Sequence, residues 1–175
     1  LQAKGNDAGV LQFYDAALAS RLDGKTRESV LLAKTSLLLK QRKYDLARET
    51  AEQALRIDSK NYKTLLNLGV IEIYSLGGNK YNAEVYSKAE QYLKRAVELN
   101  PYAADVHFFL GITYEAMGLK KEANDLYQKG LNLVDADRAL IPSVKNVIKQ
   151  SLNDGYKRTL TSNNSKSSGK LLEVA

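Results

Sequence analysis

The sequence predicts an all-α protein, an α-solenoid of stacked antiparallel helix pairs that ends in a C-terminal capping helix. Three observations predict this fold class. Small and large apolar residues recur with a period near 34 residues, no alternating β-branched run is long enough for a strand, and the only prolines are Pro101 and Pro142. Because one helix pair cannot bury its apolar face alone, stacked copies share a continuous core. At 175 residues and 44% hydrophobic content, the chain can form such a core.

The first element, residues 1–24, is predicted to be an N-terminal helix. Val10, Tyr14 and Leu18 recur at helical spacing, and Gly5 is expected in the turn before them. This arrangement suits the second helix of a pair whose first helix lies upstream in a longer protein. A simple amphipathic capping helix would show the same pattern, and both interpretations stay open.

Three repeats follow, at 28–61, 62–103 and 104–137. Ala89 and Ala123 occupy equivalent places 34 residues apart, whereas Ala47 and Ala89 are 42 apart. The middle repeat therefore carries an insertion of eight residues, which spacing within the repeats places near 75–88. Gly77, within that segment, is expected to break the helix.

The pattern changes after the third repeat. A capping helix is predicted over 138–157 from a single apolar stripe, and Lys145 stands where a further repeat would need a small residue. Asn153-Asp154-Gly155 is expected to end this helix. Residues 158–175 are predicted to form a flexible polar tail. The stripe consists of Leu140, Ile141, Val144, Val147, Ile148 and Leu152.

The tail ends in a short apolar segment, residues 171–175, which could occupy a groove of its own chain or of a second copy. Self-association through this tail is therefore a possible interaction. If copies exchange tails, deleting residues 171–175 should lower the mass measured by light scattering.

The repeated positions resemble those of tetratricopeptide repeats. The run Ala89–Pro101 is close to the second helix of the family pattern, whereas Thr35 stands where Gly or Ala is usual, and Leu31, Leu65 and His107 replace the large aromatic residue usual early in the first helix. The third repeat shows the resemblance most clearly, with these residues in register: Leu110, Gly111, Tyr114, Gly118, Ala123, Tyr127 and Gly130.

The resemblance implies a protein-protein interaction scaffold whose first helices line a concave groove. We expect an extended or helical peptide with two or three apolar anchors as the ligand, and a role as an adaptor in a multiprotein assembly. In this family an asparagine at the position of Asn67 often holds the peptide backbone, although a helix-surface amide is the alternative interpretation. The predicted groove consists of Leu32, Ser36, Leu39, Lys40, Leu66, Asn67, Val70, Ile73, Tyr74, Phe108 and Ile112.

Some family members bind the free carboxyl terminus of heat-shock chaperones through a clamp of Lys, Asn, Asn, Lys and Arg. Only Asn67 matches that clamp here, and Asp105 has the wrong charge for a carboxylate partner. The sequence therefore argues against such a clamp. The corresponding positions are Leu32, Ser36, Asn67, Asp105 and Phe109.

Catalysis has little support in the sequence. There is no cysteine, and the single histidine, His107, falls where the repeat buries an aromatic residue. A nucleophilic or zinc site would need a second histidine or a cysteine, and the sequence has neither. Gly77-Gly78 is not followed by the Lys-Ser or Lys-Thr of a phosphate-binding loop. We expect no enzyme activity, cofactor or metal. No apolar run is long enough to span a membrane, and the cytoplasm and the periplasm are both compatible compartments.

Net charge supports an alternative function, a helical repeat protein that binds nucleic acid through dispersed basic residues. The chain has 26 Lys and Arg against 20 Asp and Glu, a net charge of +6. These cations are interleaved with acids, which makes nucleic acid a less favoured partner than protein. Binding to an oligonucleotide that weakens steeply with salt would favour the alternative.

Overall fold

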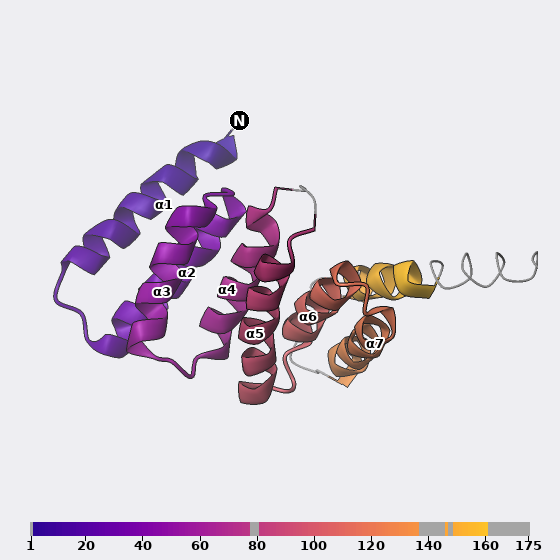
Figure 1. Ribbon diagram of the computed structural model, residues 1–175. Helices are drawn as coiled ribbons and strands as arrows, with labels where there is room; N and C mark the ends of the chain where they lie inside the picture. Colours follow the sequence, from indigo (N-terminus) through magenta and orange to yellow (C-terminus); the bar gives the residue numbers. More distant parts are fainter. Residues whose placement is uncertain (1, 78–80, 137–145, 147–148, 161–175) are drawn as a thin grey trace, which may run out of the picture. The chain divides into compact units, whose positions relative to one another are not determined.

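The computed structural model describes residues 2–77, 81–136, 146 and 149–160, and within these ranges all regular structure is α-helical (Figure 1). The predicted all-α class and helix-pair array are confirmed. Residues 149–160 form a last helix, called the terminal helix below. The other helices are α1 Gln2–Ala19, α2 Gly24–Lys40, α3 Tyr44–Ile57, α4 Tyr62–Ser75, α5 Ala83–Leu99, α6 Ala104–Ala116 and α7 Lys120–Ala136.

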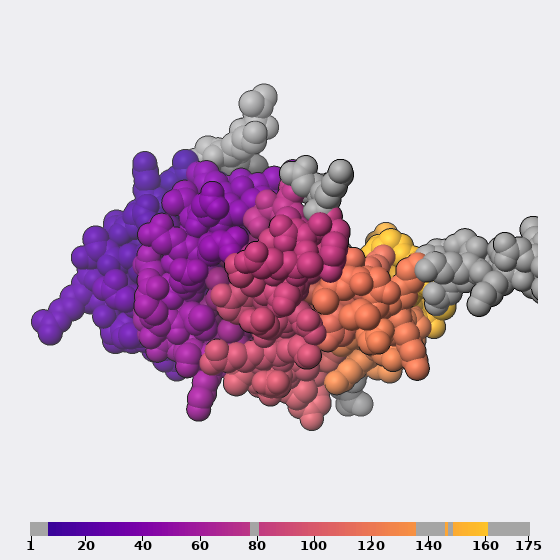
Figure 2. Space-filling view, in the orientation of Figure 1, coloured from indigo at the N-terminus to yellow at the C-terminus, as the bar shows by residue number. Residues whose placement is uncertain are grey.

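The chain divides into two compact units, residues 1–80 and 81–175. In the first unit, α2 packs against α1, α3 and α4, and α3 packs against α4. The space-filling view shows α1 and α3 as neighbouring parts of one surface (Figure 2). In the second unit, α6 packs against α5 and α7.

Capping side chains determine where α2 and α4 begin. The Asp23 carboxylate accepts hydrogen bonds from the hydroxyl and the backbone N–H of Thr26, which lower the pKa of Asp23. Asn61 caps α4 by accepting from the N–H of Lys63, and its amide donates to buried Glu28 at 2.6 Å. This second bond ties the start of α4 to α2.

Small residues let α3 approach its neighbours closely, because Ala47, Ala51 and Ala54 are fully buried. A buried ion pair adds a polar link between α3 and α4. Glu72 on α4 keeps only 4% of its surface exposed, and it accepts a hydrogen bond from the guanidinium of Arg48 on α3. Removing Arg48 would leave the Glu72 carboxylate buried without its partner.

The insertion predicted near 75–88 falls where α4 ends and α5 begins. Gly77 directly follows α4 and has φ +59°, a left-handed conformation that suits glycine, so the predicted helix break is present there. Residues 78–80 lie outside the described residues. Asn82 then caps α5 by accepting from the N–H groups of Glu84 and Val85.

In the second unit, α5 is joined to α6 by a phenol–carboxylate bond. The Tyr114 hydroxyl donates to Glu90 at 3.0 Å. Burial, helped by this bond and by the charge of Glu90, raises the pKa of Tyr114. The phenol therefore stays a donor at neutral pH.

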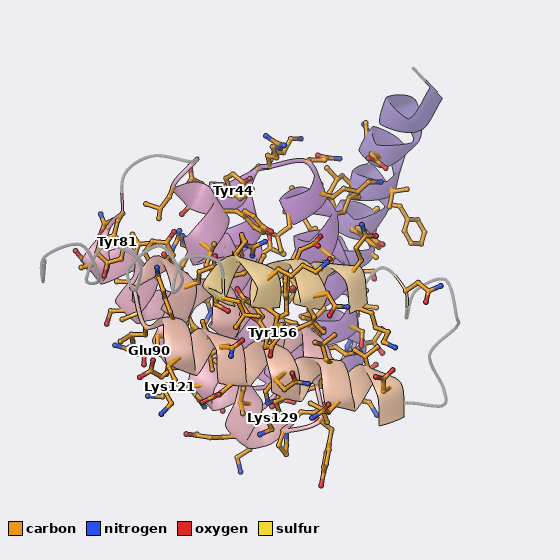
Figure 3. All side chains as sticks on the ribbon, turned by 90° about the vertical axis from the view of Figure 1, so that its right-hand side faces the viewer. Tyr44, Tyr81, Glu90, Lys121, Lys129 and Tyr156 are labelled. Atoms are coloured by element: carbon orange, nitrogen blue, oxygen red, sulfur yellow. The ribbon has the colours of Figure 1, made fainter. Side chains whose placement is uncertain are left out.

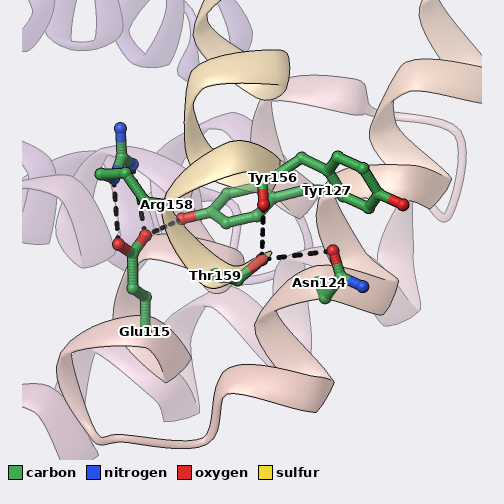
Figure 4. A network of polar contacts seen from close by, with 6 residues as sticks. All are labelled: Glu115, Asn124, Tyr127, Tyr156, Arg158 and Thr159. Carbon is green, nitrogen blue, oxygen red and sulfur yellow. Dashed lines mark hydrogen bonds and ion pairs between the residues drawn. The ribbon is translucent and has the colours of Figure 1, made fainter. Parts of the chain in front are cut away.

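The terminal helix closes the second unit against α6 and α7 (Figure 4). Leu152 is fully buried in a cluster with Tyr127, Leu131 and Val134 of α7. A Cβ on Gly155 would lie 2.6 Å from the Tyr127 ring, and a Cβ on Gly111 would also lie 2.6 Å from it. The ring of Tyr127 thus contacts the backbones of two glycines, one on α6 and one on the terminal helix.

Polar contacts surround this packed ring (Figure 4). Tyr127 donates to Glu115 at 2.7 Å, and Arg158 forms two further hydrogen bonds with the same carboxylate, at 2.9 and 3.2 Å. Burial raises the pKa of Tyr127, and the bond to Glu115 raises the pKa of Arg158. Thr159 donates to the backbone oxygen of Tyr156, and its hydroxyl lies 3.2 Å from Asn124 Oδ1.

Two sequence predictions about the ends of the array were wrong. Gly5 was expected in a turn, but α1 includes it. Asn153-Asp154-Gly155 was expected to end a helix, but the terminal helix continues to residue 160, because Gly155 makes the close contact with Tyr127 rather than a turn. Residues 137–145, 147–148 and 161–175 lie outside the described residues, and with them half of the predicted cap, including Lys145, and most of the predicted tail, including the segment 171–175.

His107 is fully buried on α6, where the repeat pattern predicts a core residue. Its Nδ1 lies 2.9 Å from the carbonyl oxygen of Ala103, so Nδ1 carries the proton and donates, while Nε2 finds no partner in the described structure. Burial lowers the pKa of His107, with a smaller contribution from Lys129, against the opposing effects of the Ala103 bond and Asp105.

We predict that His107→Phe reduces acid sensitivity. Because the folded-state pKa lies below the ordinary value near 6.5, only the unfolded chain takes up a proton at this site as pH falls through that value, and stability is lost. The variant should lose less unfolding free energy than wild type as pH falls from roughly 7.5 to 5.5. Urea denaturation at both pH values measures this difference, and equal losses would contradict it.

Candidate peptide-docking surface

The groove residues predicted on α2 lie along one side of that helix and remain accessible. Ser36 and Lys40 are exposed, while Leu32 and Leu39 are half-buried. The hydroxyl of Ser36 already donates to the carbonyl oxygen of Leu32 at 3.1 Å, and Lys40 lies 3.7 Å from Asp7 of α1. The accessible apolar surface here comes from the two leucines.

The groove residues predicted on α4 divide into two groups. Leu66, Val70 and Ile73 are each only 8% exposed, so they offer little surface to a ligand. Asn67 is half-buried, and Tyr74, near the end of the helix, is 46% exposed. An open apolar wall along α4 is therefore absent in the described structure, and Tyr74 is the main accessible side chain of this group.

The C-terminal ends of α2 and α4 meet at a surface hollow in the first unit. Three predicted groove residues, Leu39, Lys40 and Tyr74, line it together. The sequence analysis missed the other lining residues: Arg42 and Gly77 from the turns, and Tyr44 from the first turn of α3 (Figure 3). We call these six residues the docking surface.

Alignment of the repeats could have drawn attention to Arg42. It follows Thr35 at the same spacing at which Gly118 follows Gly111 in the third repeat. Arg42 thus stands at a turn position that is glycine in the third repeat. No comparable signal marks Tyr44, because its role depends on how the turn after α2 folds back.

The remaining predicted groove residues, Phe108 and Ile112, belong to α6 in the second unit. Both are half-buried and pack against the cluster that includes Tyr127 and Leu152. The Phe108 ring contacts that of Phe109 edge-on, with centroids 5.2 Å apart. Their participation in a groove stays a prediction, and much of their apolar surface already serves packing within this unit.

The described residues contain no group of His, Asp and Glu side chains placed to hold a metal ion. His107 is enclosed in packed side chains and cannot reach a substrate. Among the described helices, none has the length and apolar character needed to cross a bilayer.

Comparisons with known proteins identify the repeat. Residues 29–61 match the family described as tetratricopeptide repeat. Human cilia- and flagella-associated protein 70 is 26% identical over 140 residues, which cover 80% of this chain but only 12% of that protein.

Two solved structures illustrate the similarity in fold. The first tetratricopeptide domain of Spaghetti (RPAP3), bound to the HSP90 peptide SRMEEVD, has a TM-score of 0.64 at 18% identity, covering 82% of this chain and 97% of its own. A thermophilic tetratricopeptide repeat protein of Thermus thermophilus has a TM-score of 0.69 at 19% identity, covering 90% of this chain and 76% of its own.

Proposed function

We propose that this chain, of which residues 29–61 match the tetratricopeptide repeat family, is a protein-interaction scaffold that binds a peptide segment of a partner at the docking surface. One observation carries the proposal: Leu39, Lys40 and Tyr74, selected from the sequence as groove residues, line a single surface hollow. A similarly folded domain has been solved with a bound peptide, which supports the same class of ligand.

The chemistry of the docking surface suits a peptide with an apolar anchor. Tyr74 and Tyr44 offer ring faces with polar tips, and Leu39 adds aliphatic surface beside Lys40. Tyrosine is among the residues enriched at binding hot spots, because it buries much area while losing few rotamers. We propose that the partner inserts an apolar side chain beside Tyr74, and that the chain serves as an adaptor within a larger assembly.

We predict that Tyr74→Ala weakens peptide binding at least tenfold, because a tyrosine hot spot typically contributes about 2 kcal/mol. A phage-displayed random peptide library selected on the wild-type protein supplies the ligands, and titration of the recovered peptides measures affinity. Tyr102→Ala is the matched control, since Tyr102 is 79% exposed and lies in the other unit. Equal affinity of both variants for the selected peptides would exclude the docking surface.

A further inference from the structure

We propose that the docking surface selects acidic peptide segments, and that Arg42 binds their carboxylate. This inference rests on the proposed function and adds the chemistry of the partner. It combines three observations: an arginine held in a backbone conformation that favours glycine, a local excess of cations over acids in the described residues, and two tyrosines beside them.

The backbone of Arg42 has φ +59°, and Arg42 is the only non-glycine residue with positive φ in the described chain. The backbone N–H of Arg42 donates to the carbonyl oxygen of Leu39, and the backbone N–H of Lys43 donates to that of Leu38. In the third repeat, Gly118 has φ +80° and the same hydrogen bonds. Its backbone N–H donates to the carbonyl oxygen of Glu115, and that of the next residue donates to the carbonyl oxygen of Tyr114. Glycine closes that turn without the cost that a side chain incurs in the left-handed region.

The turn itself therefore gives no reason for an arginine at position 42, and its side chain is the remaining reason. Backbone strain of this kind clusters at functional sites. Arg42 lines three neighbouring hollows of the first unit. A guanidinium at this point reaches whatever ligand enters them.

The charge around Arg42 is predominantly positive. Arg42 and Lys43 are exposed, and within the described residues neither side chain forms a hydrogen bond or an ion pair. Lys40 forms a long ion pair with the half-buried Asp7, at 3.7 Å, so Arg42 and Lys43 are the cations left for a ligand. The acids lining these hollows are Asp7 and Asp45, against three cations.

A carboxylate is the group that this arrangement suits, because the planar guanidinium forms two parallel hydrogen bonds with it. Tyr44 and Tyr74 lie beside Arg42 and would cover apolar side chains that flank the acid. The expected ligand is thus an extended segment in which Glu or Asp residues stand beside apolar residues.

The test uses two labelled peptides, GELEELG and its neutral counterpart GQLQQLG, titrated against the full chain by fluorescence anisotropy at low salt. We expect the acidic peptide to bind wild type at least tenfold more tightly than the neutral one. Arg42→Gly should weaken the acidic peptide at least tenfold and leave the neutral one unchanged. The same variant should raise Tm by roughly 2 °C, because the turn loses its strained residue.

Lys121→Gln is the matched control for loss of one positive charge, since Lys121 is exposed and lies in the other unit. It should change the affinity for GELEELG less than twofold. Equal affinity for the two peptides, no detectable binding of GELEELG, or no effect of Arg42→Gly would overturn the proposal. Tighter binding of a labelled single-stranded oligonucleotide than of GELEELG, lost in Arg42→Gly, would overturn it as well.

The two proposals fail differently. If both peptides bind equally and Tyr74→Ala weakens both, the docking function stands and acid selectivity is wrong. If peptides selected on wild type bind Tyr74→Ala unchanged, the docking function itself is wrong, whatever the charge of the peptides.

Discussion

Replacing Arg48 with methionine should destabilise the protein by about 3 kcal/mol, one of the largest effects expected from a single substitution here. The change strands the Glu72 carboxylate, which is 4% exposed and takes its ion pair from Arg48. Arg48 itself is partly exposed, so water can reach the site once the guanidinium is gone, and the effect should fall near the lower end for buried pairs. Urea denaturation followed by circular dichroism measures the loss.

The double variant Arg48→Met/Glu72→Met separates the stranded charge from lost packing. Methionine keeps much of the aliphatic volume of both side chains, and replacing both partners of a buried pair is often neutral or stabilising. We expect the double variant to lie within about 1 kcal/mol of wild type. A double variant as unstable as Arg48→Met alone would mean that packing by the arginine stem, and not the ion pair, links α3 to α4.

The helix-pair array could be predicted from the sequence because small residues recur where helices must touch. Ala47, Ala89 and Ala123 occupy equivalent places in the three second helices, and all three are fully buried. Such positions tolerate little volume, so they leave a regular pattern in the sequence. The longer stretch between Gly69 and Ala89 likewise indicated the insertion, part of which lengthens α5 at its start.

The docking surface was only partly predictable. Leu39, Lys40 and Tyr74 could be chosen because they fall late in the first helices of two repeats. The near-complete burial of Leu66 could not be predicted from the sequence. The apolar pattern of a helix buried on several sides is the same whichever side faces a ligand. The contribution of Arg42 depends on a left-handed turn, which no side-chain periodicity records.

The terminal helix shows a second limit of prediction from the sequence. Extending the 34-residue period placed a needed small residue at Lys145, whereas the residue of the terminal helix that contacts Tyr127 closely is Gly155. A connection between helices can change length while the contact stays the same, so spacing alone loses the register there. Asn153-Asp154-Gly155 carries the composition of a helix end, but tertiary packing overrides that local preference.

Gly155→Ala should destabilise the second unit by about 2 kcal/mol, although alanine is the better helix former. The added Cβ would lie 2.6 Å from the Tyr127 ring. The ring cannot move aside, because Gly111 contacts it closely as well and its hydroxyl is bonded to Glu115. The terminal helix must therefore shift, at the cost of its own contacts with Glu115 and Asn124.

Gly9→Ala is the matched control, because Gly9 also lies within a helix but a Cβ there would meet nothing within 4 Å. It should be neutral or stabilise the protein by up to about 1 kcal/mol through helix propensity alone. The variant Tyr127→Leu tests the cause, since a smaller side chain leaves room for the Cβ. In that background Gly155→Ala should cost less than in wild type, as a double-mutant cycle would show. If the cost is unchanged, the glycine is needed for a reason other than contact with the ring.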